Sequence, residues 1–257
     1  MQVAALKRAP MKLSIITPVF NDPRVSRALD SILSQKHKED LELIVIDGGS
    51  RTPTLDVLER YRKHISVLVS EPDKGIYDAM NKGIALATGE VVGILNADDR
   101  YYDPFILRDI AEAFRDPNID ACYGDLIYVD SQDRTVRYWK SGDYKALKYY
   151  FGWMPPHPTF YVRKRLYERY GNFDLRYPIA ADYELMFRFI FKNSVSLNYI
   201  PRVLVKMSLG GKSNRSLKNI SKANLEVWQA WRNNYCSFGY LVPFLKPAQK
   251  VFQYAHR

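Results

Sequence analysis

Val91-Val92-Gly93-Ile94-Leu95-Asn96-Ala97-Asp98-Asp99 joins an apolar run directly to three side chains with oxygen acceptors. The first five residues are apolar or Gly, which is typical of a strand buried on both faces. Asn96, Asp98 and Asp99 follow at the point where this strand would end. In an open α/β sheet, ligands bind at the carboxyl ends of the strands. The stretch therefore predicts a central strand with a ligand site at its end.

The adjacent carboxylates of Asp98 and Asp99 indicate what this ligand carries. Two such groups repel each other unless a positive charge lies between them. A hard divalent cation is commonly held by one or two carboxylates together with phosphate oxygens. We therefore expect a divalent metal cofactor, Mn²⁺ or Mg²⁺, that bridges to a phosphate ligand. The alternative is a polar turn that leads into a helix capped by Asp103-Pro104.

Strands and helices alternate around this stretch over the first 115 residues. The expected strands cover residues 12–17, 41–47, 65–70 and 91–95. The expected helices, with apolar residues at helical spacing, cover residues 23–35, 55–62, 76–87 and 104–115. Such alternation predicts an α/β fold with a Rossmann-like, mainly parallel sheet flanked by helices. Three of the strands end on Thr17, Asp47 and Asn96, so these residues should meet at one edge.

The pattern changes after Ala121 to a mixed region. The expected strands cover residues 121–128, 135–139, 159–162 and 196–209, and an aromatic, Pro-rich loop covers 149–158. Helices are expected at 182–190 and 218–234. We therefore divide the chain into an N-terminal extension (1–10), a domain (11–210) with halves 11–120 and 121–210, and a C-terminal helical tail (211–257).

The composition excludes several classes of protein. The chain has 257 residues, of which 47% are hydrophobic and 26% charged, so it can bury a large core and should not be disordered. Its two cysteines give no disulfide framework. The sequence shows neither the apolar run of a signal peptide nor the roughly 20 apolar residues of a transmembrane helix. These features predict a cytoplasmic protein.

The net charge of +10 lies almost entirely in the C-terminal part. Residues 201–257 hold ten Lys or Arg and one acid, Glu226, together with many aromatic residues. Basic and aromatic residues favour an anionic membrane surface, which would hold the protein at the inner face of the cell membrane, or nucleic acid. The alternative is a solvated helix face whose aromatic residues pack on the main domain.

The first strand is not followed by the Gly-rich fingerprints of dinucleotide-binding or P-loop proteins. Other motifs lie at the predicted ligand edge: Ser14-Ile15-Ile16-Thr17-Pro18-Val19-Phe20-Asn21, Ile46-Asp47-Gly48-Gly49-Ser50, Asn96-Ala97-Asp98-Asp99 and the run from Ser70-Glu71-Pro72-Asp73-Lys74-Gly75 to Ile76-Tyr77-Asp78-Ala79-Met80-Asn81-Lys82-Gly83. With these motifs, the chain resembles a family 2 glycosyltransferase of the A-type nucleotide-sugar fold. It is similar to enzymes that make bacterial surface polysaccharides of the colanic-acid type, most strongly over residues 11–115.

The resemblance implies a nucleotide-diphospho-sugar donor bound by residues 11–120 and an acceptor bound by residues 121–210. It places at the substrates Thr17, Pro18, Phe20, Asp47, Gly48, Asp73, Lys74, Tyr77, Asn81, Asn96, Asp98 and His157. It implies that Asp98 and Asp99, as a DXD-type motif, serve the ribose and the metal. Two residues depart from the family pattern: Gly48 replaces an Asp that often recognises uracil, and Asn96 replaces the first Asp of the DXD motif.

Asp182 is the catalytic base that the resemblance implies. In the family an acidic dipeptide before a helix supplies this base, and here its first member is Ala181. An inverting transfer needs a carboxylate to accept the proton of the attacking hydroxyl. The alternative is that Asp182 is an N-cap, which would favour its anion and weaken it as a base. For His157, in Pro155-Pro156-His157-Pro158, the alternative is a loop residue without a role.

These observations lead us to expect an inverting, metal-dependent glycosyltransferase that adds single sugars to a glycan or lipid-linked acceptor in cell-surface polysaccharide biosynthesis. Gln229-Ala230-Trp231-Arg232 lacks the spacing and order of the Gln-x-x-Arg-Trp motif of processive synthases, so its Trp should face the core. Two rivals are a nucleotidyltransferase and a non-catalytic nucleotide- or RNA-binding module. The resemblance disfavours nucleic acid as the partner.

Overall fold

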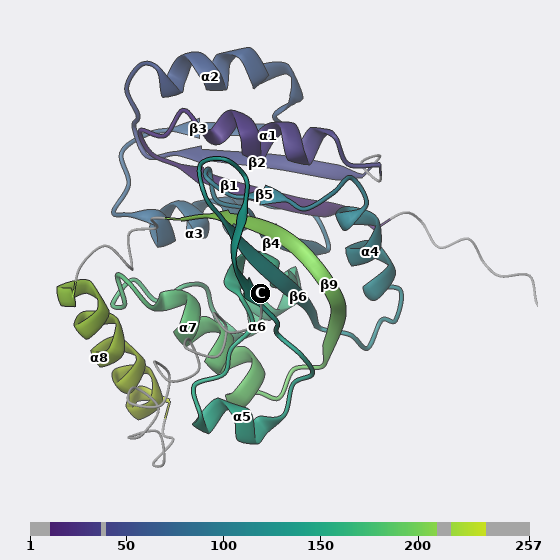
Figure 1. Ribbon diagram of the computed structural model, residues 1–257, viewed down its shortest axis with the longest axis vertical. Helices are drawn as coiled ribbons and strands as arrows, with labels where there is room; N and C mark the ends of the chain where they lie inside the picture. Colours follow the sequence, from purple (N-terminus) through teal and green to yellow (C-terminus); the bar gives the residue numbers. More distant parts are fainter. Residues whose placement is uncertain (1–10, 37–39, 210–216, 235–257) are drawn as a thin grey trace, which may run out of the picture.

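The computed structural model describes residues 11–36, 40–209 and 217–234, and its strands form one sheet with helices on both faces (Figure 1). Within these residues nine strands have the order β3-β2-β1-β4-β8-β6-β9-β5, with β7 paired to β6. The strands are β1 (Leu13–Val19), β2 (Leu41–Asp47), β3 (Val67–Ser70), β4 (Val91–Ile94), β5 (Arg100–Tyr101), β6 (Ala121–Val129), β7 (Thr135–Trp139), β8 (Tyr161–Arg163) and β9 (Leu197–Ser208).

The helices cover the sheet between these strands. They are α1 (Val25–Leu33), α2 (Thr54–Tyr61), α3 (Ile76–Leu86), α4 (Ile106–Ala113), α5 (Ala146–Tyr150), α6 (Lys164–Tyr170), α7 (Ala181–Met186) and α8 (Leu217–Asn233). Three short turns of other helix types are the 3₁₀ helices η1 (Arg62–His64) and η2 (His157–Thr159) and the π-helix η3 (Phe187–Lys192), which directly continues α7.

The first half of the sheet is parallel, as the alternating sequence predicts. β1 lies between β2 and β4, and β2 also pairs with β3, each in parallel register. Val19 pairs with Asp47, and Ile16 pairs with Ile94. The carboxyl ends of these strands therefore meet at one edge, which confirms the predicted common position of Thr17, Asp47 and Asn96.

The second half of the sheet is mixed. β8 joins β4 and β6 in antiparallel pairs, whereas β6 and β9 run parallel. This arrangement confirms the mixed region expected after residue 120. The sequence did not indicate the two-residue β5 or helix α6, and α5 covers the start of the stretch 149–158 that was expected to be a loop. Such short elements present too few residues for a periodic pattern.

Two apolar layers lie on opposite faces of the sheet, because alternate residues of a strand point to opposite faces. Ile15 faces the layer that includes α1, α2 and α4, and Ile16 faces the layer that includes α3, α6 and α7. Val227, Ala230 and Trp231 of α8 are buried in the second layer. Helix α8 follows residue 210, where the sequence predicts the tail to begin, and yet it shares the core of the domain.

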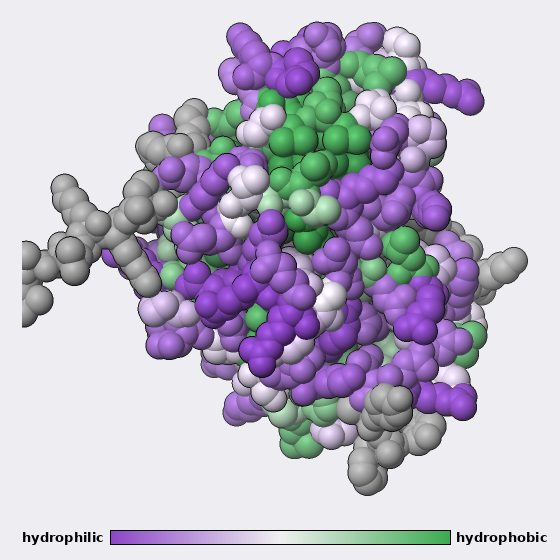
Figure 2. All heavy atoms as spheres, turned by 180° about the vertical axis from the view of Figure 1, so that it is seen from behind, coloured by the Kyte–Doolittle hydropathy of each residue, from purple (hydrophilic) through white to green (hydrophobic). Residues whose placement is uncertain are grey.

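The face of the molecule opposite to the view of Figure 1 is mostly polar but carries one apolar area. Figure 2 shows apolar side chains gathered on the back of the molecule, at the height of β1–β3, and polar side chains over most of the rest of that face. In the described ranges, none of the helices combines the length and apolar character that a bilayer crossing requires. The predicted N-terminal extension and residues 235–257 of the predicted tail lie outside the described residues.

Candidate functional site

Thr17, Pro18 and Phe20 lie where β1 reaches the ligand edge. Thr17 is fully buried, and its Oγ1 has no hydrogen-bond partner among the described residues. Pro18 is buried and pairs with Ile46 across the sheet, whereas Phe20 is 53% exposed just beyond the strand. The end of β1 thus contains a buried hydroxyl without a partner, and the loop after it presents an aromatic ring to solvent.

Asp47, at the end of β2, organises the neighbouring loops. Its fully buried carboxylate accepts the backbone N–H of Ser50, with Oδ2 at 3.0 Å, and the hydroxyl of Ser70 at 2.6 Å. Its carbonyl accepts the N–H of Glu71 at 3.0 Å. Asp47 therefore ties the loop after β2 to the end of β3 and fixes the wall to which Gly48 and Asp73 belong.

Gly48 and Asp73 lie directly against each other in this wall. A Cβ atom on Gly48 would overlap the carboxylate of Asp73, with the Cγ atom of Asp73 at 3.0 Å. Asp73 itself is held in position because its Oδ1 accepts the N–H of Gly75 at 2.8 Å. Lys74 is exposed beside it. The carboxylate of Asp73 therefore occupies the space that a longer residue 48 would fill.

The turn after β4 contains one accessible and one buried carboxylate. Asp99 is 1% exposed, and Asn96 donates to its Oδ2 at 3.0 Å. Burial and the charge of Asp98 raise the pKa of Asp99 well above its ordinary value, against the opposing hydrogen bond from Asn96. Asp98 is half-buried, and its carbonyl accepts the hydroxyl of Ser208 at 2.7 Å.

The oxygen atoms of this turn fit a divalent cation. Asn96 Oδ1 and Asp99 Oδ1 are buried without hydrogen-bond partners in the described part of the chain, and all the donors are hard oxygens. No group of three or more His, Cys, Asp or Glu residues suited to a metal occurs among the described residues. A cation here would therefore need ligands from its substrate, as Mg²⁺ does when it is shared with phosphates.

Arg24 is a neighbour of this turn that sequence reasoning missed. Its guanidinium donates to Asp22 at 2.5 and 2.8 Å and lies 3.6 Å from Asp98 Oδ2. The hydrogen bond to Asp22 raises the pKa of Arg24, and Asp98 and Asp99 add to this effect. Arg24 thus supplies a fixed positive charge next to Asp98. No motif marks it, because the contact arises only when the loop after β1 reaches β4.

Asp182 lies in the first turn of α7 and meets Tyr77 of α3. Its Oδ1 accepts the N–H of Tyr183 at 2.8 Å and lies 3.1 Å from the Tyr77 hydroxyl, which also contacts the carbonyl of Ile179 at 2.9 Å. Helix α7 begins at Ala181 with Ala180 as N-cap, so the N-cap alternative for Asp182 was wrong. Asp182 is half-buried, and no hydrogen bond within the described ranges reaches its Oδ2.

Phe173 brings Asn81 and His157 close to this pair. Its ring stacks on Tyr77 at 5.4 Å and meets the imidazole of His157 edge-on at 5.6 Å. Asn81 accepts the N–H of Phe173 and donates to its carbonyl, both at 2.9 Å, so its amide is already used as a clamp. Burial lowers the pKa of His157, although the charge of Asp182 opposes the shift. His157 therefore stays neutral near pH 7.

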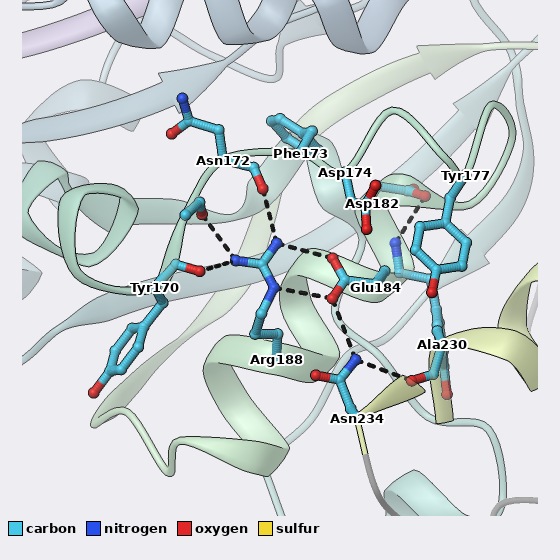
Figure 3. Close-up of polar contacts among 12 residues, drawn as sticks. Tyr170, Asn172, Phe173, Asp174, Tyr177, Asp182, Glu184, Arg188, Ala230 and Asn234 are labelled. Carbon is cyan, nitrogen blue, oxygen red and sulfur yellow. Dashed lines mark hydrogen bonds and ion pairs between the residues drawn. The ribbon is translucent and has the colours of Figure 1, made fainter. Parts of the chain in front are cut away.

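Arg188 fastens the loop that carries Phe173 to α7 (Figure 3). Its guanidinium donates to both carboxylate oxygens of Glu184, at 2.9 and 2.8 Å, and to the carbonyls of Tyr170, Gly171 and Asn172. All of its N–H groups are then used. A cavity of about 300 Å³ lies beside these residues, but Arg188 has no donor left for a ligand there.

Comparison with known proteins identifies the family of this chain. The model of Glycosyl transferase family 2 matches residues 14–189. A PGL/p-HBAD biosynthesis glycosyltransferase of Mycobacterium bovis is 32% identical over 213 residues, which cover 80% of this chain and 80% of that protein.

Solved structures show the same fold at low identity. Mannosyltransferase PcManGT from Pyrobaculum calidifontis, in complex with GDP-Man and Mn²⁺, has a TM-score of 0.66 and 17% identity, covering 96% of this chain and 76% of that one. S. aureus TarS has a TM-score of 0.64 and 19% identity, covering 90% of this chain and 44% of that one, so this chain spans less than half of TarS.

The family match favours a glycosyltransferase over the nucleotidyltransferase and the binding module. It spans most of the chain and includes every residue that the sequence assigned to the site. The structural likenesses agree with it in fold. The chain therefore belongs to glycosyl transferase family 2 and is a glycosyltransferase with the A-type fold.

Proposed function

We propose that this enzyme transfers a hexosyl group from a nucleoside diphosphate sugar to a hydroxyl of a glycan or lipid-linked acceptor, with inversion at the anomeric carbon. In this single displacement, the acceptor oxygen bonds to the anomeric carbon as the bond to the diphosphate oxygen breaks. The hydroxyl proton passes to Asp182, and the nucleoside diphosphate leaves with the electron pair of the broken bond.

The observation that carries the proposal is the open oxygen of Asp182. Both hydrogen bonds to its carboxylate end on Oδ1, which leaves Oδ2 to accept a proton. Burial and the charge of Asp182 raise the pKa of Tyr77 well above its ordinary value. Tyr77 therefore stays protonated and orients the carboxylate. A general base placed in this way contributes roughly a hundred- to ten-thousand-fold to the rate.

The nucleotide would lie at the edge formed by Thr17, Asp47 and Asn96. Asp73, whose carboxylate fills the space beside Gly48, would supply the acidic group that the family often places at residue 48. Lys74, exposed next to Asp73, would compensate the charge of the diphosphate. The nucleobase of the donor would then be one that can donate a hydrogen bond to the carboxylate of Asp73.

Asp98 would hold the divalent cation, with Asn96 and Asp99 behind it. When bound, such a cation neutralises charge that develops on the leaving diphosphate. Asp98 is the accessible carboxylate and would be the principal ligand, whereas Asp99 is buried and bonded to Asn96 through Oδ2, so it would contribute only its unpartnered Oδ1. The solved neighbour with GDP-Man and Mn²⁺ supports this use of a metal.

Addition of single sugars is supported by the position of Trp231. This residue is 1% exposed and donates from Nε1 to the Tyr183 hydroxyl at 2.8 Å, so it packs in the core as the sequence predicts. A role in surface polysaccharide synthesis near a membrane rests on the resemblance and on the basic residues of 201–257.

The experiment that tests this function has two steps. A screen of nucleotide sugars for thermal stabilisation, with and without Mn²⁺, identifies the donor, because a ligand that binds the native state raises its apparent stability. Nuclear magnetic resonance of the product of the transfer reaction then gives the anomeric configuration. We expect stabilisation that requires Mn²⁺ and a product of inverted configuration, and retention of configuration would rule out the single displacement.

A further inference from the structure

Glu226 connects helix α8 to the segment that precedes Asp182. Glu226 is 3% exposed, and its Oε2 accepts the backbone N–H groups of Ile179 and Ala180 at 2.9 and 2.8 Å. These groups lie immediately before α7, where a helix leaves backbone N–H groups without partners. Glu226 therefore satisfies the start of α7 from a different helix, and no capping side chain of α7 itself does so.

The same short segment is also held by Tyr77. The carbonyl of Ile179 and the carboxylate of Asp182 share the Tyr77 hydroxyl, at 2.9 and 3.1 Å. Ile179 is thus hydrogen-bonded both by Glu226 of α8 and by Tyr77 of α3. Because Asp182 follows two residues later, displacement of this segment would shift both the carboxylate and its hydrogen bond to Tyr77.

Trp231 of α8 and Asn234, which directly follows α8, contact the residues of α7 after Asp182. Trp231 donates to the Tyr183 hydroxyl at 2.8 Å, and Asn234 donates to Glu184 at 3.3 Å, the latter visible in Figure 3. Glu226 adds the contact at the beginning of α7. Helix α8 therefore holds both ends of the turn that carries Asp182, although it lies beyond residue 189, where the family match ends.

We propose that Glu226 is a positioning residue for the transfer reaction: from α8 it fixes residues 179 and 180 and thereby the orientation of Asp182. The proposal rests on the proposed function, in which Asp182 is the base. Glu226 Oε1 has no partner among the described residues, so only Oε2 is needed for the role. Misplacement of a reacting group by about 1 Å can cost a hundredfold in rate.

The test compares three substitutions of Glu226 in the full chain. Glu226→Gln keeps a carbonyl oxygen for both N–H groups, so we expect turnover within a few-fold of the native enzyme. Glu226→Ala and Glu226→Asp withdraw that oxygen, and we expect kcat to fall by about tenfold to a hundredfold. The Mn²⁺-dependent affinity for the nucleoside diphosphate should stay unchanged in all three, measured by calorimetric titration.

Val227→Ala is the matched control, because it removes buried contacts of the neighbouring residue on α8 but keeps both hydrogen bonds from Glu226 to residues 179 and 180. It should lower the melting temperature while kcat stays near the native value. The combination Glu226→Ala with Asp182→Asn should be no slower than Asp182→Asn alone, because residues that act through one group are not additive.

The outcomes separate this proposal from the proposed function. If Asp182→Asn itself keeps native turnover, the assignment of the base fails. If Asp182→Asn is slow but Glu226→Ala and Glu226→Asp turn over normally, Asp182 remains the base and the positioning role of Glu226 is wrong. The role is also wrong if Val227→Ala loses as much kcat as Glu226→Ala, or if Glu226→Gln does not restore the rate.

Discussion

Asp98 and Asp99 are neighbours in the sequence, but their surroundings differ. Asp98 is accessible, whereas Asp99 is 1% exposed and has a raised pKa caused mainly by burial. We therefore expect Asp98→Asn to weaken Mn²⁺-dependent binding of a nucleoside diphosphate more than Asp99→Asn does. Calorimetric titration measures this, with Asp56→Asn, an exposed acid on α2, as the control. Equal affinity of Asp98→Asn and the control for the nucleoside diphosphate with Mn²⁺ would show that the metal does not bind at this turn.

A substitution at Gly48 tests whether Asp73 takes part in donor binding. Gly48→Ala would place a methyl group against the Asp73 carboxylate, which Gly75 holds from its other side. We expect the carboxylate to be displaced and the affinity for the nucleoside diphosphate to fall by about tenfold, the effect of roughly one charged hydrogen bond. Asp73→Asn should weaken binding similarly. Native affinity in both variants would show that the donor does not contact this wall.

At the scale of elements, Glu42 of β2 joins three segments of the parallel sheet. Its carboxylate accepts from Ser14 of β1 at 2.6 Å, from the Thr88 N–H at 2.7 Å and from Lys12 at 3.0 Å. Burial alone would raise the pKa of Glu42, but these hydrogen bonds outweigh it and lower the pKa to about 2. The folded state therefore favours the ionised form.

This pKa predicts how stability depends on pH. Because the folded pKa lies below the ordinary value of 4.5, the contribution of Glu42 is complete above about pH 4.5 and is lost as the pH falls toward 2. This contribution to the free energy of unfolding is about 2–3 kcal/mol. It follows from about 1.36 kcal/mol for each pKa unit, lowered because solvent near Lys12 screens the interaction. Urea unfolding between pH 3 and 7 should show this loss in the native chain and in Glu59→Gln, an exposed control, but not in Glu42→Gln. The same slope in Glu42→Gln would contradict it.

The elements that the sequence predicts well are those with long periodic patterns. The strands ending at Val19, Asp47 and Ile94 and the helices between them follow from apolar spacing, and so does the edge where their polar ends meet. β5 is two residues long and α6 seven, so neither carries a readable period. The start of α7 depends on Glu226, more than 40 residues away in sequence, and no local signal marks such a cap.

At the scale of the whole molecule, the basic C-terminal part has two predicted roles. Helix α8 packs in the core, as the packing alternative predicts for Trp231, while residues 235–257 lie outside the described residues. Deletion from Ser237 onward should leave nucleoside diphosphate binding intact and reduce sedimentation with anionic vesicles. Each basic residue near such a surface contributes about 1 kcal/mol, so binding should also weaken with added salt. Equal sedimentation of the truncated chain would show that this segment does not bind membranes.

The candidate site assembles segments that are distant along the chain, which limits what sequence alone reveals. The resemblance places Tyr77 and Asp182 at the substrates. The fold brings the Tyr77 hydroxyl to 3.1 Å from Asp182 Oδ1, although the two residues are 105 positions apart in the sequence. Arg24, Phe173 and Glu226 were missed, because each acts through a tertiary contact and stands in no motif. Asn81 and Asp47 already bond to backbone, so part of their role is to shape the site.

The central claim is that Asp182 accepts the proton of the acceptor hydroxyl, and steady-state kinetics of Asp182→Asn test it most directly. Asn keeps the size of the side chain and an oxygen for the Tyr77 and Tyr183 contacts, but it cannot accept a proton. We predict that kcat falls roughly a hundred- to ten-thousand-fold while the affinity for the donor stays near the native value. Turnover close to that of the native enzyme would contradict the account.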